Sequence, residues 1–167
     1  DQGITSLSEF ESALDILYFI RFWKSLKDQL SKDDRAAIAD CAGEKIDLLN
    51  LEWLARAKRH YKLSADAIME LLIPVWYRLK KSQARELAEA PSIEEFDRIL
   101  KGTRYGNRIF RASGDQQENP EFRSLFRELL DAVYSKSERN DPYSAAALNS
   151  YFYFKEEEIR KIITTVE

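Results

Sequence analysis

Residues 45–58 read KIDLLNLEWLARAK, and their apolar side chains recur at the spacing of an α-helix. Two neighbouring sides of that helix are apolar: one carries Ile46, Leu49, Trp53 and Ala57, and the other carries Leu48, Leu51, Leu54 and Ala55. A helix that is covered on one face only has a narrower apolar stripe than this. The pattern therefore predicts a helix over about 46–60 at the centre of a bundle, with Leu51, Trp53 and Leu54 buried.

The rest of the chain shows helical spacing almost throughout and holds few residues that break helices, with only 5 Gly and 4 Pro. Further helices are predicted over about 9–30, 31–41, 64–73, 75–90 and 93–101, and after the N-cap candidates Asn119 and Asp141. Gly43 is expected to separate the helix at 31–41 from the central helix. Ser64 and Ser92 are predicted N-caps. The aromatic run at 151–154 is the one competing strand. The predicted fold class is therefore all-α, a bundle of helical repeat units.

Composition narrows the class of protein further. The chain has 167 residues, of which 33% are charged and 44% hydrophobic. Its formal net charge of -3 argues against a general nucleic-acid binder, which is normally basic. No apolar run reaches the roughly 20 residues that cross a bilayer. Cys41 is the single cysteine, which excludes an internal disulfide framework and fits a reducing compartment.

An internal similarity suggests two related helical units. Residues 45–58 align with YFKEEEIRKIITTV at 153–166, which sets Leu51, Leu54 and Ala55 against Ile159, Ile162 and Ile163. EFESALDILY at 9–18 aligns with EFRSLFRELL at 121–130 at nearly the same offset. A repeat of roughly 110 residues would give one unit at 1–112 and a truncated second unit at 113–167. Two amphipathic helices also align this well by chance, so repeat and coincidence both stay open.

Residues that carry enzyme chemistry are scarce. His60 is the only histidine and lies in RAKRHYK at 56–62, where a helix is predicted to end, so it is expected to be a capping or surface residue. There is no second His or Cys for a zinc site or an activated nucleophile. The run Glu156 to Glu158 is expected to be a solvated first helical turn. KGTRYGNRIFR at 101–111 lacks the Gly-Lys-Ser/Thr ending of a phosphate loop. The sequence thus predicts no catalytic residue, cofactor or metal.

The segment 101–111 is nevertheless the strongest candidate for a binding site. Its basic and aromatic residues have no acidic neighbour between Asp97 and Asp115, and its two glycines suggest a loop. Such a loop could bind an acidic protein surface, a phosphate backbone or anionic lipid headgroups. Alternatively, its arginines simply stay solvated. The predicted partner-binding residues are Lys101, Arg104, Tyr105, Arg108, Phe110 and Arg111.

Four stretches in order resemble one known family: DLLNLEWLARAKRHYKLS (47–64), LLIP (71–74), APSIEEFDRIL (90–100) and DPYSAAALNSYFYFKEEEIRKIITTVE (141–167). They are similar to the C subunits of bacterial and archaeal V-type (A-type) ATP synthases, whose eukaryotic counterpart is the d subunit of the V-ATPase. The resemblance implies a funnel-shaped all-helical protein of three similar units. The chain would cover about its second half, without the first repeat and the G-x-R-Y-G-L-like segment that usually follows the last helix. A start at Asp1 and an apolar pattern that stops at 166 also lead us to expect a piece of a longer protein.

The resemblance also implies a function. The family is a non-catalytic spacer on the cytoplasmic face of the membrane, peripheral to it, which couples the rotor stalk of the ATP-hydrolysing head to the membrane ring of proteolipid subunits. Its partners would be these other ATPase subunits and no nucleic acid, and the complex would move H⁺ or Na⁺. Two alternatives remain: a generic helical-repeat scaffold, and a nucleic-acid-binding helical domain that uses 98–111 and RAKRHYK.

Overall fold

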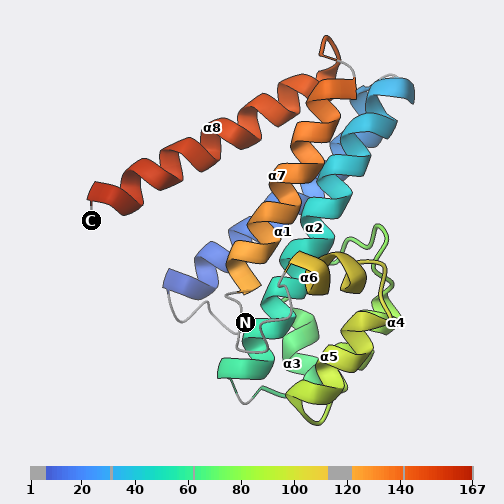
Figure 1. Cartoon of the computed structure of the whole chain (residues 1–167), viewed down its shortest axis with the longest axis vertical. Coiled ribbons are helices and arrows are strands. Elements are labelled where there is room, and N and C mark those ends of the chain that lie inside the picture. Colours follow the sequence, from blue (N-terminus) through green and yellow to red (C-terminus); the bar gives the residue numbers. More distant parts are fainter. Residues whose placement is uncertain (1–6, 31, 62, 113–121, 141, 167) are drawn as a thin grey trace.

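The described part of the chain is built from α-helices alone (Figure 1). This computed structural model describes residues 7–30, 32–61, 63–112, 122–140 and 142–166. The long helices are α1 (Leu7–Gln29), α2 (Lys32–His60), α7 (Phe122–Asn140) and α8 (Ala145–Val166). The short ones are α3 (Ala65–Glu70), α4 (Lys81–Glu89), α5 (Ile93–Lys101) and α6 (Gly106–Ala112). The predicted all-α class is confirmed, and the aromatic run 151–154 lies inside α8.

Helix α2 lies at the centre, where it contacts α1, α4, α7 and α8. Figure 1 shows α3 to α6 gathered around the C-terminal half of α2, α7 alongside it, and α8 leaving the far end of α7 at a wide angle. The main hydrophobic core forms around Leu48, Leu51 and Leu54, and the last two are buried as predicted. Trp53 is only half-buried and packs against this core from its edge.

Gly43 does not break a helix, because α2 runs without interruption from Lys32 to His60. The prediction of a break was wrong for a steric reason. A Cβ atom at Gly43 would overlap the ring of Tyr77. Glycine therefore lets the Tyr77 ring approach the backbone of α2, and the neighbouring turns hold the helix together.

The predicted helix at 75–90 begins only at Lys81, because residues 71–80 are held by side chains of α2. The Asn50 side chain donates to the carbonyl oxygen of Ile73 at 3.0 Å, and its Oδ1 accepts the N–H of Ile73 at 2.8 Å. Asp47 accepts three further backbone N–H groups from residues 77–79. These side-chain bonds replace the bonds that a helix would have formed, so the segment stays non-helical.

The helix starts agree with the sequence at two positions and differ at a third. Ser64 Oγ accepts the N–H of Ala67, and Ser92 Oγ accepts that of Glu95, so both predicted N-caps are confirmed. Helix α8 begins at Ala145 rather than directly after Pro142, with Ser144 Oγ accepting the N–H of Ala147 at 3.2 Å. The other predicted caps, Asn119 and Asp141, lie outside the described residues.

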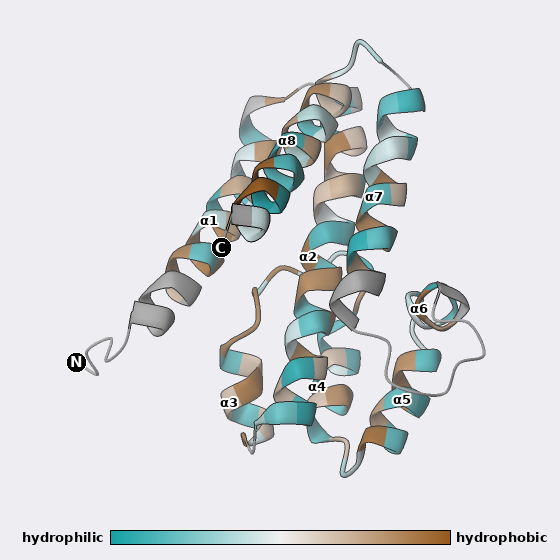
Figure 2. Ribbon diagram, turned by 60° about the vertical axis from the view of Figure 1, so that its left-hand side comes forward, coloured by the Kyte–Doolittle hydropathy of each residue, from teal (hydrophilic) through white to brown (hydrophobic). Residues whose placement is uncertain are grey.

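Helices α7 and α8 share the core of α2. Phe126, Leu129, Leu130 and Tyr134 of α7 and Tyr153 of α8 belong to the same buried cluster as the leucines of α2. Figure 2 shows hydrophobic residues between the packed helices and also along α8. The predicted division into units 1–112 and 113–167 stays a prediction, since the expected boundary falls at residues outside the described ranges.

Candidate docking site

The basic segment forms a tight turn between α5 and α6, which we call the 102–106 turn. Thr103 Oγ1 donates to the carbonyl oxygen of Leu100 at 2.7 Å and accepts the N–H of Gly106 at 3.2 Å. A Cβ atom at Gly106 would overlap the backbone of Leu100 and Lys101. The turn therefore needs glycine at 106 so that the start of α6 can pass close to the end of α5.

The turn separates the predicted binding residues into exposed and buried ones. Arg104 and Lys101 are exposed, and the Lys101 ammonium lies 4.8 Å from the centre of the Phe110 ring. Phe110 is half-buried against the main core. Tyr105, one of the predicted partner-binding residues, is fully buried and so does not reach the surface where a partner would bind. The side chain of Arg111 lies outside the described residues.

Tyr105 points inward because its hydroxyl binds a buried carboxylate on α2. It donates to Asp47 Oδ2 at 2.7 Å. The same carboxylate accepts the backbone N–H groups of Arg78 at 2.6 Å, Leu79 at 2.8 Å and Tyr77 at 3.1 Å. Burial raises the pKa of Asp47, and these four hydrogen bonds oppose that rise by stabilising the carboxylate. One side chain thus joins α2, residues 77–79 and the 102–106 turn.

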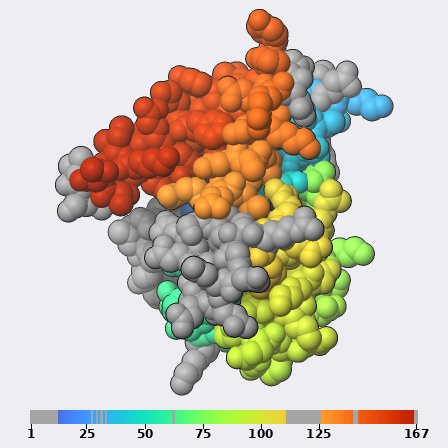
Figure 3. Space-filling model, in the orientation of Figure 1, coloured from blue at the N-terminus to red at the C-terminus, as the bar shows by residue number. Residues whose placement is uncertain are grey.

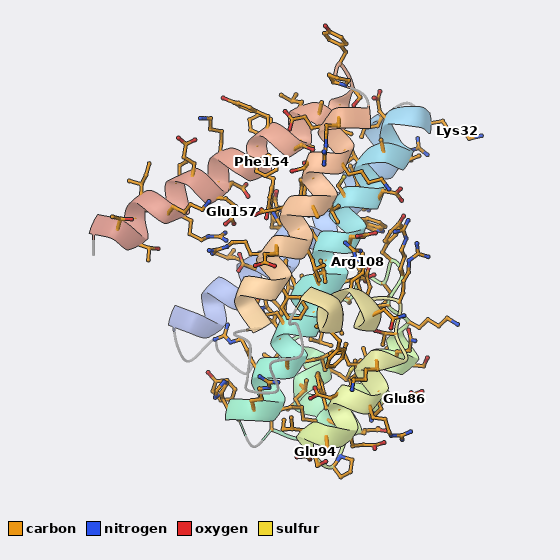
Figure 4. The ribbon with its side chains drawn as sticks, in the orientation of Figure 1. Lys32, Glu86, Glu94, Arg108, Phe154 and Glu157 are labelled. Carbon is orange, nitrogen blue, oxygen red and sulfur yellow. The ribbon has the colours of Figure 1, made fainter. Side chains whose placement is uncertain are left out.

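A second carboxylate, one turn earlier on α2, holds the arginines that flank this anchor. Glu44 is 7% exposed and accepts from Arg108 Nη1 at 2.7 Å and from Arg78 Nη1. Arg78 also lies 3.3 Å from Asp40, which accepts a hydrogen bond from the Tyr77 hydroxyl. In Figure 4, Arg108 points from α6 toward α2. Arg108 therefore fastens α6 to α2 through Glu44.

Sequence reasoning missed these carboxylates although the signal was present. Asp40, Glu44 and Asp47 are spaced so that they share one face of a continuous helix. The assumed break at Gly43 placed them on two different helices and hid that alignment. A polar stripe on a helix whose other sides are apolar indicates buried polar contacts.

The run Glu156 to Glu158 is not a solvated first turn, because α8 begins eleven residues earlier, at Ala145. Glu157 is 7% exposed and is paired with Arg127 of α7, at 3.1 Å, and with Arg160, at 2.5 Å. Figure 4 shows Glu157 on the side of α8 that faces α7. Glu157 thus contributes a buried carboxylate, paired with two partly exposed arginines, to the junction between the two helices.

The ring of Tyr153 forms the aromatic part of the same junction. It stacks on Tyr134 of α7 with ring centres 4.1 Å apart, and its hydroxyl donates to Asp131 at 2.8 Å. Lys45 of α2 lies 5.5 Å from the centre of the same ring and forms an ion pair with Glu156 at 3.5 Å. These contacts fix the first half of α8 on α2 and α7.

The second half of α8 presents an apolar stripe to solvent. Ile159, Ile162 and Ile163 are 57%, 58% and 54% exposed, and Figure 3 shows α8 projecting beyond the body of the molecule. Leu14, Leu17 and Tyr18 of α1 are about half exposed as well, and a groove lined by Tyr18, Phe22, Phe152 and Ile159 separates the two helices. Exposed apolar surface of this extent is typical of interfaces.

Alkaline pH is expected to destabilise the fold through its buried tyrosines. Burial raises the pKa of Tyr105, Tyr134 and Tyr153 well above that of free tyrosine, and burial together with the bond to Asp40 raises the pKa of Tyr77 to about 12. Unfolded tyrosine ionises near pH 10, so above that pH the unfolded chain releases protons that the folded chain retains. We expect the free energy of unfolding in urea to fall as the pH rises from about 10 to 12. The replacement Tyr153→Phe should weaken that fall, and a flat profile would contradict these environments.

Two kinds of feature are absent from the described ranges. They contain no group of three or more His, Cys, Asp or Glu side chains placed to hold a metal ion. None of the helices they include is long and apolar enough to span a bilayer.

His60 is the last residue of α2, among the basic residues of its final turn, as predicted. Of the RAKRHYK patch, Lys62 lies outside the described residues.

Comparison with known proteins identifies the family of the chain. Residues 2–167 match the family described as ATP synthase (C/AC39) subunit. The chain belongs to this family. One curated relative is the C subunit of the A-type ATP synthase of Methanobrevibacter smithii, which is 28% identical over 156 residues. The aligned region covers 91% of the chain and 40% of that relative, and no solved structure matches. The resemblance inferred from the four sequence stretches is thereby confirmed.

Proposed function

We propose that this chain is part of a non-catalytic coupling subunit in the central stalk of a rotary V-type or A-type ATP synthase. In this role it seats the rotor stalk of the ATP-hydrolysing head on the membrane ring of proteolipid subunits and passes torque between them. It lies on the cytoplasmic face of the membrane, peripheral to it, while the complex moves H⁺ or Na⁺. The observation that carries the proposal is the family match over residues 2–167.

The build of the described helices supports a mechanical role. The 29-residue helix α2 is held by an apolar core, by the carboxylate Asp47 and by the ion pairs of Glu44. Torque transmission requires elements that do not yield under load, and a long helix fixed by both apolar and polar contacts satisfies that requirement. The exposed apolar stripe on α8 supports a protein that works within an assembly.

We propose Lys101 and Arg104 as the docking residues, because they are the exposed cations among the described side chains of the basic segment. Both are exposed at the end of α5 and on the 102–106 turn, whereas Arg108 and Arg78 are already paired with Glu44. The Lys101 ammonium lies over the ring of Phe110. Charges at the rim of an interface mainly set the association rate and its dependence on salt.

Removal of both charges is expected to weaken assembly without affecting the fold. A tagged subunit with Lys101→Ala and Arg104→Ala should co-purify with the other ATPase subunits roughly threefold to tenfold less well than the wild type, since each exposed pair contributes about 0.2–1 kcal/mol. The deficit should shrink as salt is raised, because screening removes the advantage that the two charges give the wild type. The matched control is Lys24→Ala with Lys136→Ala, which removes two exposed lysines from α1 and α7.

The control should assemble like the wild type, and both double variants should melt at the same temperature as the wild type. Equal assembly of the two double variants would show that Lys101 and Arg104 are solvated surface. Failure of the wild-type protein itself to co-purify with any other ATPase subunit would contradict the proposed function as a whole.

A further inference from the structure

We propose that Asp47 and Tyr105 are positioning residues that hold the backbone at Arg104 in a fixed place, from which its side chain binds a carboxylate of a protein partner. The inference rests on the proposed docking function and names the chemistry of the partner at that site. It concerns two buried residues that make no contact with the partner themselves. Their effect reaches the surface because Arg104 directly precedes Tyr105 in the chain.

The 102–106 turn is anchored from the core by the buried pair Tyr105 and Asp47. Tyr105 is fully buried, and its hydroxyl donates to Asp47 Oδ2 at 2.7 Å. That oxygen also accepts the N–H groups of Arg78 and Leu79, so the carboxylate cannot rotate without breaking bonds to another segment. A charge-assisted hydrogen bond to an immobile acceptor fixes both the depth and the direction of the tyrosine.

The backbone is rigid on either side of Arg104. Thr103 bonds to Leu100 and Gly106 through its hydroxyl, and the contact of Gly106 with the backbone of Lys101 leaves no space for a Cβ. The turn is thus fixed at the residues before and after Arg104, and the guanidinium leaves it toward solvent. In the described part of the chain, no hydrogen bond or ion pair occupies that guanidinium. The backbone of such a turn loses little freedom when its arginine binds a partner, which favours affinity.

The charges around the turn favour a carboxylate on a protein over a polyanion. Arg78 and Arg108 are neutralised by Glu44 and Asp40. Among the side chains of residues 101–110, the exposed cations are Lys101, which lies near Asp97, and Arg104. Binding to nucleic acid or to an anionic membrane draws on several cations at once, whereas the chain as a whole carries a net charge of -3. A planar guanidinium matches a single carboxylate through two parallel hydrogen bonds.

The test is a double-mutant cycle between Tyr105 and Arg104, measured by competition. Each tagged variant is co-expressed with the wild-type protein, and mass spectrometry gives the ratio of the two in the purified complex. Tyr105→Phe removes only the hydroxyl that binds Asp47. In the wild-type background we expect Tyr105→Phe to lower incorporation about threefold or more, which is the size of coupling measured between interacting residues. When Arg104→Ala is already present, Tyr105→Phe should have no further effect. Arg104→Lys keeps the charge but lacks the planar fork, and should fall between the wild type and Arg104→Ala.

Any other result of the cycle contradicts either the positioning role of Tyr105, the docking role of Arg104 or the carboxylate partner. An equal loss from Tyr105→Phe in both backgrounds would make Tyr105 a purely structural residue. A loss from Arg104→Ala with none from Tyr105→Phe would end the positioning role and leave the docking role intact. No loss from either variant would remove the docking role as well. If incorporation is unchanged while binding of the chain to phosphatidylserine vesicles falls in Arg104→Ala, the ligand is a lipid headgroup and the carboxylate partner is wrong.

Discussion

Replacement of Asp47 by alanine is expected to lower the free energy of unfolding by about 3–5 kcal/mol. The change removes the acceptor of four hydrogen bonds, from the Tyr105 hydroxyl and from the backbone N–H groups of residues 77–79. Each buried donor that loses its partner costs about 1–3 kcal/mol, and water that enters the cavity recovers part of this sum. Urea unfolding monitored by circular dichroism gives the value directly.

Two variants serve as controls for Asp47→Ala. Asp47→Asn keeps the shape but replaces one accepting oxygen with a donor that faces other donors, so it should also destabilise the fold. Glu86→Ala removes an exposed carboxylate from α4 and should change the free energy of unfolding by less than about 0.5 kcal/mol. A change below about 1 kcal/mol for Asp47→Ala would mean that the carboxylate does not bind the segments we have assigned to it.

Leu54→Ala is expected to destabilise the protein by about 2–5 kcal/mol, because it opens a cavity in the main core. Leu54 is fully buried on α2 and belongs to the cluster that joins α2 with residues of α3, α4 and α7. Ile162→Ala is the matched control, since Ile162 lies on the exposed stripe of α8 and its loss should cost less than about 0.5 kcal/mol. Comparable losses for the two variants would show that one of these helix faces is wrongly assigned.

The central helix of this fold could be predicted from the sequence because α2 carries apolar residues on two sides. Such a helix must be covered by neighbours on both of those sides. Leu51 and Leu54 are buried as that pattern requires, and Ser64 and Ser92 begin helices as their side chains favour. Each of these features is determined by residues within about one or two helical turns. Local spacing is enough to predict them.

The errors arose where distant residues override local preference. Gly43 usually indicates a helix end, but here it makes room for the ring of Tyr77, more than thirty residues away in sequence. The helix predicted over 75–90 begins only at Lys81, because Asp47 accepts the backbone N–H groups of residues 77–79. Tyr105 looked like an exposed aromatic in a basic loop, and its depth depends on a carboxylate 58 positions earlier. Local sequence patterns do not reveal such long-range contacts. The exposed basic residues of the candidate site could therefore be predicted, and the buried residues that support them could not.

The position of this protein within the assembled ATP synthase tests the central claim most directly. Electron microscopy of the complex, purified through a tag on the polypeptide that carries these residues, gives that position. The proposed role predicts density for α1 to α8 on the rotation axis, between the rotor stalk and the proteolipid ring, with the 102–106 turn in contact with a neighbouring subunit. Density for these helices on a peripheral arm, or a complex that is complete without them, would contradict it.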